Sequence, residues 1–368
     1  MIESLYIHIP FCNSICTYCS FTKRIYNEEL AHKYVLNLLK DLERIEKKSL
    51  KTIFIGGGTP SSLSNLDIEL LLSKLQELLS ENYEFTIESN PENLSIEKTE
   101  ILKKYGINRV SIGVQTFDSR HLKLLGRKHT HIDVEKAIDN LKKCGIDNIN
   151  LDLIYGIPNQ SLNEFINDIK LSLKYDIKHI SLYSLTIDEH TVLNNRKVEE
   201  ANEDLLREMS DKASEILEQN GIKKYEVSNY SIDGYESRHN LTYWFDKEYY
   251  GIGIGASGYE GNKRYTNIST LTEYLKGERK QSIEIVDDYN HEYEYIMLNL
   301  RTKYGINFDD FKKIFNKDFI KFYQNEINDM KEFFIVDNES IKVKDNHYMI
   351  LNSLIIKFIE RLEVGESG

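Results

Sequence analysis

The chain has 368 residues, of which 40% are hydrophobic and 29% charged, and its formal net charge is −12. No apolar run approaches the ~20 residues that a bilayer-spanning helix needs, and a negative surplus argues against a nucleic-acid surface, which rests on positive charge. The first residues, MIESLYIHIPF, carry an acidic residue and an early proline where a signal peptide would carry positive charge and an apolar run. We therefore expect a cytoplasmic protein without a membrane span.

Strand-like and helix-like segments alternate along the first half of the chain. Short β-branched or aromatic runs are followed by segments with helical spacing of apolar residues, such as LNEFINDIKLSL. This alternation predicts an α/β fold of parallel βα units with right-handed crossovers, hence a partial, TIM-like (β/α)6 barrel. The six predicted strands are SLYIHI, KTIFIG, EFTIES, NRVSIG, DNINLD and KHISLYS.

The prolines mark the ends of four predicted strands. Pro10, Pro60, Pro91 and Pro158 follow the strand-like runs in IHIP, GGGTP, ESNP and YGIP. Because proline restrains a loop and stops a strand ladder, these strands end in shaped loops. In a βα barrel such loops open on one face, where we expect the chemistry.

The pattern loosens after residue 185, which predicts three parts: a barrel core over 1–185, an extension over 186–286 and a small α-rich C-terminal domain over 287–368. The extension has a predicted helix around 203–219 and contains HNLTYW. Helices are predicted in the last part over HEYEYIMLNLRTK, NFDDFKKIF, DMKEFF and MILNSLIIKFIE.

Three cysteines, Cys12, Cys16 and Cys19, are crowded into the loop CNSICTYC, while Cys144 stands alone. In a reducing compartment such a cluster indicates a metal site rather than disulfides. Zinc usually takes four protein ligands in two spaced pairs, although His8 could complete such a site here. Three thiolates suit a cubane iron–sulfur cluster that keeps one iron free. We predict the cluster, with zinc as the alternative.

The motif CNSICTYC, in a loop after the first barrel strand, resembles the cluster motif of the radical S-adenosylmethionine (SAM) superfamily. The resemblance implies a [4Fe–4S] cluster held by Cys12, Cys16 and Cys19, with the amino and carboxylate groups of SAM on the fourth iron. It also implies reductive cleavage of SAM to methionine and a 5′-deoxyadenosyl radical. Tyr18 would then pack near the adenine.

The same resemblance implies a set of SAM contacts. Gly57, Gly58 and Thr59 follow a strand in GGGTP, where glycines let the backbone approach a ligand. Arg127 suits a carboxylate because its planar guanidinium can bind it bidentately. Taken singly, each of these residues is usually an ordinary turn or surface residue. The remaining implied contacts are Tyr6, Glu88, Gln115 and Asp152.

Further motifs over essentially the whole chain, among them IHIPFC, RVSIGVQTF, DLIYGIP and HNLTYW, resemble one branch of this superfamily. The branch contains oxygen-independent coproporphyrinogen III oxidase and its relative, the haem chaperone HemW. Phe21 stands where the oxidase has a further cysteine, and eleven residues precede Cys12 where the oxidase has an extended segment. HNLTYW resembles the HNxxYW signature of the chaperone.

The resemblance thus implies a chaperone that binds haem and hands it to apo-haemoproteins, membrane cytochromes among them, with help from an electron donor. The oxidase is the alternative, and a zinc-stabilised binding module is a third reading. The sequence leaves open whether SAM is cleaved productively, and therefore whether the protein is an enzyme.

We predict His239 in HNLTYW as the axial ligand for haem iron, since a neutral imidazole commonly fills that role. Tyr243 and Trp244 could cover a porphyrin face. In the alternative, His239 belongs to a core turn and hydrogen-bonds there. The other candidate ligands are His8, His129, His131 and His190.

Overall fold

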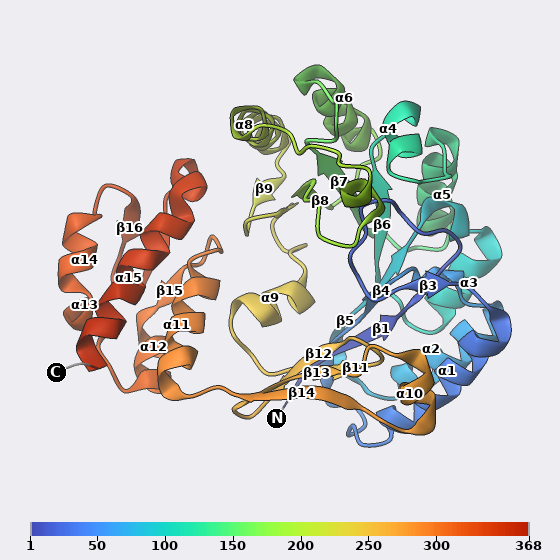
Figure 1. The fold of residues 1–368 in the computed structure, drawn as a ribbon, viewed down its shortest axis with the longest axis horizontal. Coiled ribbons are helices and arrows are strands. Elements are labelled where there is room, and N and C mark those ends of the chain that lie inside the picture. Colours follow the sequence, from blue (N-terminus) through green and yellow to red (C-terminus); the bar gives the residue numbers. More distant parts are fainter. Residues whose placement is uncertain (1, 367–368) are drawn as a thin grey trace.

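A computed structural model describes residues 2–366 and is built around a nine-stranded sheet in the order β11-β1-β4-β5-β6-β7-β8-β10-β9 (Figure 1). Its six central strands are parallel, and each overlaps one predicted strand, which confirms the predicted fold class. The central strands are β1 (Ser4–Ile9), β4 (Leu50–Gly57), β5 (Leu79–Ser89), β6 (Arg109–Gln115), β7 (Asn148–Tyr155) and β8 (His179–Ser184).

Strands from later in the chain extend both sides of this sheet. β11 (Tyr250–Ile252) runs parallel to β1, while β10 (Asn229–Ser231) is antiparallel to β8 and carries β9 (Lys223–Lys224) beyond it. The predicted boundary at residues 185 and 186 therefore falls inside a continuous sheet. The three-part division stays a prediction.

Helices cover the outer face of the sheet because the outward side chains of its strands are apolar. In β6, for example, Val110, Ile112 and Val114 are fully buried against them. The helix α1 begins after Asn27, whose side chain accepts a hydrogen bond from the Leu30 amide as an N-cap. The covering helices are α1 (Glu28–Leu42), α2 (Asn65–Gln76), α3 (Ile96–Lys104), α5 (His131–Lys143), α6 (Leu162–Leu173) and α8 (Glu203–Gln219), with the shorter α4 (Ser119–Leu124) and α7 (Val192–Asn195) between them.

The inward side chains of the same strands are polar, which is unusual, since barrel interiors are generally filled by branched apolar residues. Strand side chains alternate between the two faces, so β6 turns Arg109, Ser111 and Gln115 inward. Arg109 is only 2% exposed, and its neighbours include the Glu88 and Asp152 carboxylates. Polar side chains that can form hydrogen bonds therefore fill the interior of the barrel, below its open end.

The last part of the chain has its own hydrophobic core, with Phe311, Tyr323 and Phe358 at its centre. Its small sheet is antiparallel, in the order β15-β17-β16. The elements after the barrel strands are α9 (Arg238–Trp244), β12 (Ser257–Glu260), β13 (Lys263–Asn267), α10 (Leu271–Lys276), β14 (Lys280–Ile285), α11 (Asp288–Asn299), β15 (Ile306–Asn307), α12 (Phe308–Phe315), α13 (Phe319–Phe322), α14 (Gln324–Asp329), β16 (Phe334–Val336), β17 (Ser340–Val343) and α15 (Leu351–Glu366).

One helix prediction in this region is wrong. The run DMKEFF was expected to be helical, but α14 ends at Asp329 and the run leads into β16. Phe334 pairs with Val343 there and is buried in the core, so tertiary pairing overrides the local helical pattern.

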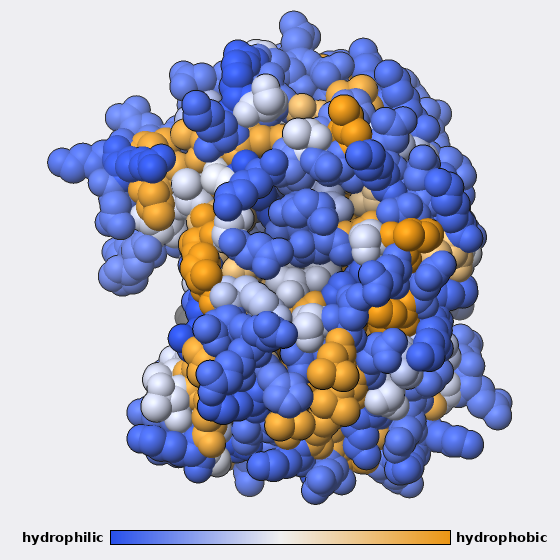
Figure 2. Space-filling view, turned by 90° about the vertical axis from the view of Figure 1, so that its right-hand side faces the viewer, coloured by the Kyte–Doolittle hydropathy of each residue, from blue (hydrophilic) through white to orange (hydrophobic). Residues whose placement is uncertain are grey.

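No helix within residues 2–366 is long and apolar enough to cross a bilayer. On the face shown in Figure 2, hydrophilic residues cover most of the surface and the hydrophobic residues form separate patches.

Candidate functional site

A cavity of about 330 Å³ lies at the carboxyl ends of the central strands. All the predicted cluster ligands and all but one of the predicted SAM contacts line it, although they come from six different segments of the chain. The predicted residues in its wall are Cys12, Cys16, Tyr18, Cys19, Gly57, Gly58, Thr59, Glu88, Gln115, Arg127 and Asp152.

The cysteine loop is held in place by backbone contacts on both sides. Two short strands, β2 (Phe11–Cys12) and β3 (Arg24–Ile25), pair in parallel at its base. At its tip the Thr17 amide donates to the Leu125 carbonyl (3.0 Å), and the Thr17 hydroxyl donates to the Leu124 carbonyl (2.8 Å). Three thiols are thereby presented to one cavity without a disulfide between them.

Two of these thiols, those of Cys12 and Cys19, lie in surroundings that oppose their ionisation. Burial raises the pKa of Cys12 to about 11, and the hydrogen bond from Thr59 offsets this only in part. Burial also raises the pKa of Cys19. Since metals bind thiolates, a cationic centre is what would stabilise three deprotonated sulfurs here, and the donor set fits an iron–sulfur cluster.

His8 has no nitrogen to spare for a metal. Its Nε2 is 2.7 Å from the Thr22 carbonyl and its Nδ1 is 3.1 Å from the Tyr6 hydroxyl. The imidazole therefore fixes the end of the cysteine loop, which leaves a zinc site at this place without its fourth ligand.

The glycine run is shaped by close contact with the cysteine loop. A Cβ on Gly58 would lie 2.8 Å from the Cys12 sulfur and 2.8 Å from the Pro10 carbonyl carbon, so only glycine fits. The amides of Gly57, Gly58 and Thr59 are already used, by Glu88, by the Ile9 carbonyl and by the Phe11 carbonyl. A ligand could therefore not use these amides, contrary to what glycine runs often provide.

Two carboxylates face the cavity. Glu88 accepts a hydrogen bond from the Gly57 amide (3.0 Å), while burial, with the Asp152 charge as the next cause, raises its pKa to about 8. Asp152 accepts from the Ser111 hydroxyl and the Asn150 amide, both at 2.8 Å, and burial raises its pKa as well. Both groups gain from a cationic or hydroxyl partner in the cavity.

Arg127 is a half-buried cation in the cavity wall. It donates to Asn90, and its Nε has no hydrogen-bond partner among the described residues. Burial alone would lower its pKa, but Tyr18 and Cys16 raise it, so the guanidinium stays charged. An orphaned donor on a charged group in a cavity suits an anionic ligand such as a carboxylate.

Sequence reasoning missed several residues of this wall. Asn90 positions Arg127, Ser111 holds Asp152, and Tyr183 lies at the end of β8. Asn90 precedes Pro91 at a strand end, and this position is the signal that could have drawn attention to it. Ser111 carries no such signal, because its partner lies 41 residues away.

Two predicted residues lie below the cavity instead. Tyr6 is not in its wall and stacks on Phe54 in the barrel interior. His239 is fully buried in α9, which packs against β4. Its Nδ1 is 2.8 Å from the Thr52 hydroxyl and its Nε2 is 2.7 Å from the Tyr243 hydroxyl.

His239 therefore has the core arrangement that the sequence left open as the alternative to haem ligation. Burial lowers its pKa to about 3, so the imidazole is neutral. Ligation of iron would require it to give up a hydrogen bond and to leave the interior, at a cost of a few kcal/mol.

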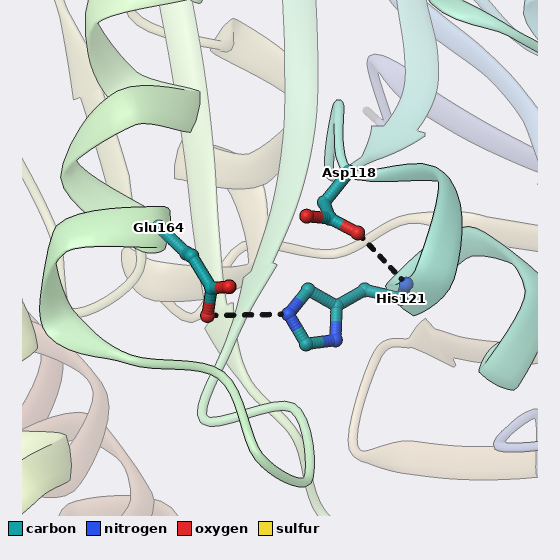
Figure 3. A group of neighbouring side chains, drawn as sticks. All are labelled: Asp118, His121 and Glu164. Atoms are coloured by element: carbon teal, nitrogen blue, oxygen red, sulfur yellow. Dashed lines mark hydrogen bonds and ion pairs between the residues drawn. The ribbon is translucent and has the colours of Figure 1, made fainter.

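A second group of ionisable side chains lies apart from the cavity, where Asp118 and His121 approach Glu164 (Figure 3). Asp118 is the N-cap of α4, and Glu164 completes the capping box of α6 with Ser161. Arg120 pairs with both carboxylates. Its hydrogen bond lowers the pKa of Asp118 to about 2, and the Ser161 amide, followed by Arg120, lowers the pKa of Glu164 to about 2. Helix capping and ion pairing account for this group.

Comparison with known proteins agrees with this geometry. The family model of the radical SAM superfamily matches residues 6–172. The chain is 38% identical to Heme chaperone HemW of Lactococcus lactis, with 97% of each chain covered. It is 34% identical to Heme chaperone HemW of Bacillus subtilis, with 94% of this chain and 95% of that one covered.

Among solved structures, coproporphyrinogen III oxidase (HemN) from Escherichia coli, described as a radical SAM enzyme, has the same fold. Its TM-score is 0.83 at 18% identity, with 97% of this chain and 90% of that chain covered. The sequence similarity to the curated relatives extends over nearly the full length of the chain. The chain therefore belongs to the HemW family of the radical SAM superfamily.

Proposed function

We propose that this protein is a haem chaperone, which binds haem and delivers it to apo-haemoproteins from a scaffold that also binds a [4Fe–4S] cluster and SAM. The observation that carries the proposal is the joint one: three thiols converge on one cavity in a chain that is 38% identical, over 97% of its length, to a relative named Heme chaperone HemW. The cytoplasm, where thiols stay reduced, is the compartment that the proposal requires.

Cys12, Cys16 and Cys19 would hold the cluster, and the cavity beside them would hold SAM. Arg127 offers a charged donor for the SAM carboxylate, and Glu88 and Asp152 offer acceptors for its amino group or its hydroxyls. Tyr18 would lie against the adenine, with Gln115 and the Gly57–Thr59 turn completing the wall. Once bound, the cluster supplies the electron for reductive SAM cleavage.

Coproporphyrinogen III oxidase activity is the second candidate, on the ground of the shared fold alone. Phe21 is 68% exposed at the edge of the cavity, where a fourth thiol would stand in the oxidase. An apolar side chain in that place suits a flat hydrophobic cargo better than further cluster chemistry.

The test is anaerobic reconstitution with iron and sulfide, followed by three assays on one sample. Haem titration should give a saturable Soret change, and haem should pass to an apo-haemoprotein such as apomyoglobin. Incubation with coproporphyrinogen III, SAM and a low-potential reductant should give no protoporphyrinogen. Turnover in the third assay without haem transfer would favour the oxidase, and colourless protein containing zinc would favour a structural zinc site.

A further inference from the structure

Haem iron needs an accessible imidazole if histidine is to be its axial ligand. His8, His121, His129, His179 and His239 are all buried. Three others are engaged, His32 with Asp67, His131 with the Tyr175 hydroxyl and His291 with Asp246, and His347 packs against the Phe333 ring. His190 is exposed, and within the described chain its ring makes no hydrogen bond or ion pair.

His190 lies in the loop that joins β8 to α7 and is next to the cavity wall, not part of it. Asp188, two residues earlier, lines the cavity wall. Just after His190 the loop is tied to the cysteine loop, because the Leu193 amide donates to the Thr17 carbonyl (3.0 Å). The imidazole is thus carried by the same segment that closes one side of the thiol-lined cavity.

The backbone at His190 is held in an uncommon conformation. Its φ is +67°, in the left-handed region that non-glycine residues seldom adopt. The next residue, Thr191, anchors it: the hydroxyl donates to the Asp188 carbonyl (2.8 Å) and accepts from the Asn194 amide (3.2 Å). A strained residue held by a rigid anchor presents its side chain in a defined direction, as a ligand requires.

Exposed apolar side chains surround the mouth of the cavity. Phe21 is 68% exposed and Tyr183 43% exposed, and both line the cavity edge; Val192, the first residue of α7 after the His190 loop, is 39% exposed. They come from three separate segments, so their shared location does not follow from one apolar run of sequence. Flat apolar surface of this kind suits the face of a porphyrin.

Charged side chains near the cavity suit two different parts of haem, its propionates and its central iron. Arg196 and Lys197 follow α7, are exposed and form no ion pair with a described residue, so they are free to bind propionates. Asp188 and Glu189 are exposed beside His190, where they favour the positive charge of ferric iron and repel propionates. This asymmetry orients haem with its propionates toward α7.

We propose that His190 is the axial ligand through which this chain holds haem, and that haem lies across the cavity mouth on Phe21, Tyr183 and Val192. The inference rests on the proposed function and adds the ligand and the place of binding. It moves the iron ligand away from the HNLTYW segment, whose histidine is buried.

The test compares the full-length reconstituted protein with His190→Ala and with the matched control His131→Ala, which removes another exposed histidine. Haem is titrated by Soret absorbance, and the axial ligand is identified by resonance Raman and electron paramagnetic resonance. We expect His190→Ala to weaken haem binding by at least about tenfold and to lose the histidine signature, which added imidazole should restore. His131→Ala should behave as wild type.

Phe21→Ser tests the contribution of the apolar surface to haem binding independently of the axial ligand. It should weaken haem binding while the histidine signature is kept. His190→Ala with wild-type affinity and an unchanged axial signature would overturn the inference and leave the proposed function standing, as would a lost signature that imidazole does not restore. Wild-type protein that shows no Soret change would overturn both.

Discussion

At the scale of single residues, the site is defined by ionisable groups in surroundings that do not suit their charge. Glu88 and Asp152 face the same cavity, with Arg109 beneath them and Arg127 above. A neighbouring carboxylate raises the pKa of a buried carboxyl group, and a neighbouring cation lowers it. The balance at Glu88 favours the protonated form in the protein without ligands.

Glu88→Gln tests this balance. The pKa of Glu88 is raised to about 8 by burial, so its contribution to the free energy of unfolding is full below its unfolded pKa of about 4.5 and falls as pH rises through about 8. Relative to wild type, Glu88→Gln should therefore gain stability above about pH 8, on the order of 2–4 kcal/mol. Urea unfolding of the ligand-free protein at about pH 6 and about pH 9 measures it, with the exposed Glu97→Gln as control. An equal difference at both pH values would contradict the expected titration.

Gly58→Ala tests the contact between the glycine run and the cysteine loop. Its Cβ would lie 2.8 Å from the Cys12 sulfur, so the loop must shift and the cluster should be lost or bound in low yield. Iron and sulfide content after reconstitution is the measurement. Gly221→Ala is the control for the steric contact: its Cβ would meet nothing within 4 Å, so only the strain of its left-handed backbone (φ +77°) is added, far from the cluster, and iron loading should be unchanged. Full iron loading of Gly58→Ala would show that the loop tolerates the displacement.

At the scale of elements, the helix α9 closes the lower end of the barrel. Ser237 caps it, and the Glu84 carboxylate accepts hydrogen bonds from the amides of Arg238 and His239 (both 3.0 Å). Thr242 reaches the Ser4 hydroxyl (2.9 Å). The HNLTYW segment therefore joins β1, β4 and β5, far from the cysteine loop.

His239→Ala should consequently destabilise the fold without removing the cluster. The change empties a packed site and removes a hydrogen-bond partner of Tyr243 and one of the two partners of the Thr52 hydroxyl, which keeps Ser4; the cost should be about 2–4 kcal/mol. Chemical denaturation gives the free energy of unfolding, and iron content reports the cluster. His131→Ala, at an exposed position with one hydrogen bond to the Tyr175 hydroxyl, should keep the cluster and cost less stability than His239→Ala. If His239→Ala had wild-type stability, the packing of α9 against the lower end of the barrel would not depend on this imidazole.

The elements also show what sequence can and cannot predict. The six strands were predictable because each is a short β-branched or aromatic run bounded by turn residues. The helices α6 and α8 were predictable because their apolar residues recur with helical spacing. DMKEFF was assigned the wrong structure. The SAM contacts could be proposed because the motifs at the strand ends resemble those of the radical SAM superfamily. The burial of His239 depends on Thr52, 187 residues away, and no local pattern carries that contact.

At the scale of the whole molecule, an ion-pair network joins the barrel side to the last part of the chain. Asp246 and Arg264 lie on the barrel side, and His291 and Glu294 lie on α11. Arg264 binds Asp246 (2.9 Å) and Glu294, and His291 Nε2 is 3.0 Å from Asp246. The contact is electrostatic, so its strength follows the charge of His291.

His291→Ala should therefore have a pH-dependent effect. The hydrogen bond with Asp246 raises the pKa of His291, so the stabilisation is full below the unfolded pKa of about 6.5 and is lost as pH rises through the higher folded pKa. The variant should lose more stability at about pH 5.5 than at about pH 9, as measured by urea unfolding. In the Asp246→Asn background this pH dependence should disappear. A loss that is equal at both pH values would assign His291 a packing role only.

The order of the large sheet has a consequence for how a bulky guest enters. Among the described strands, β11 and β9 are its two ends and do not pair with each other, so the wall has a seam where a complete barrel would have none. In a closed barrel, continuous hydrogen bonding between neighbouring strands fixes the diameter. Here no ladder joins β9 to β11, so backbone hydrogen bonds alone do not fix the width of the opening. The entry of a rigid planar molecule then depends on the side chains and loops between β9 and β11. A covalent crosslink between these two strands would fix the width of the opening.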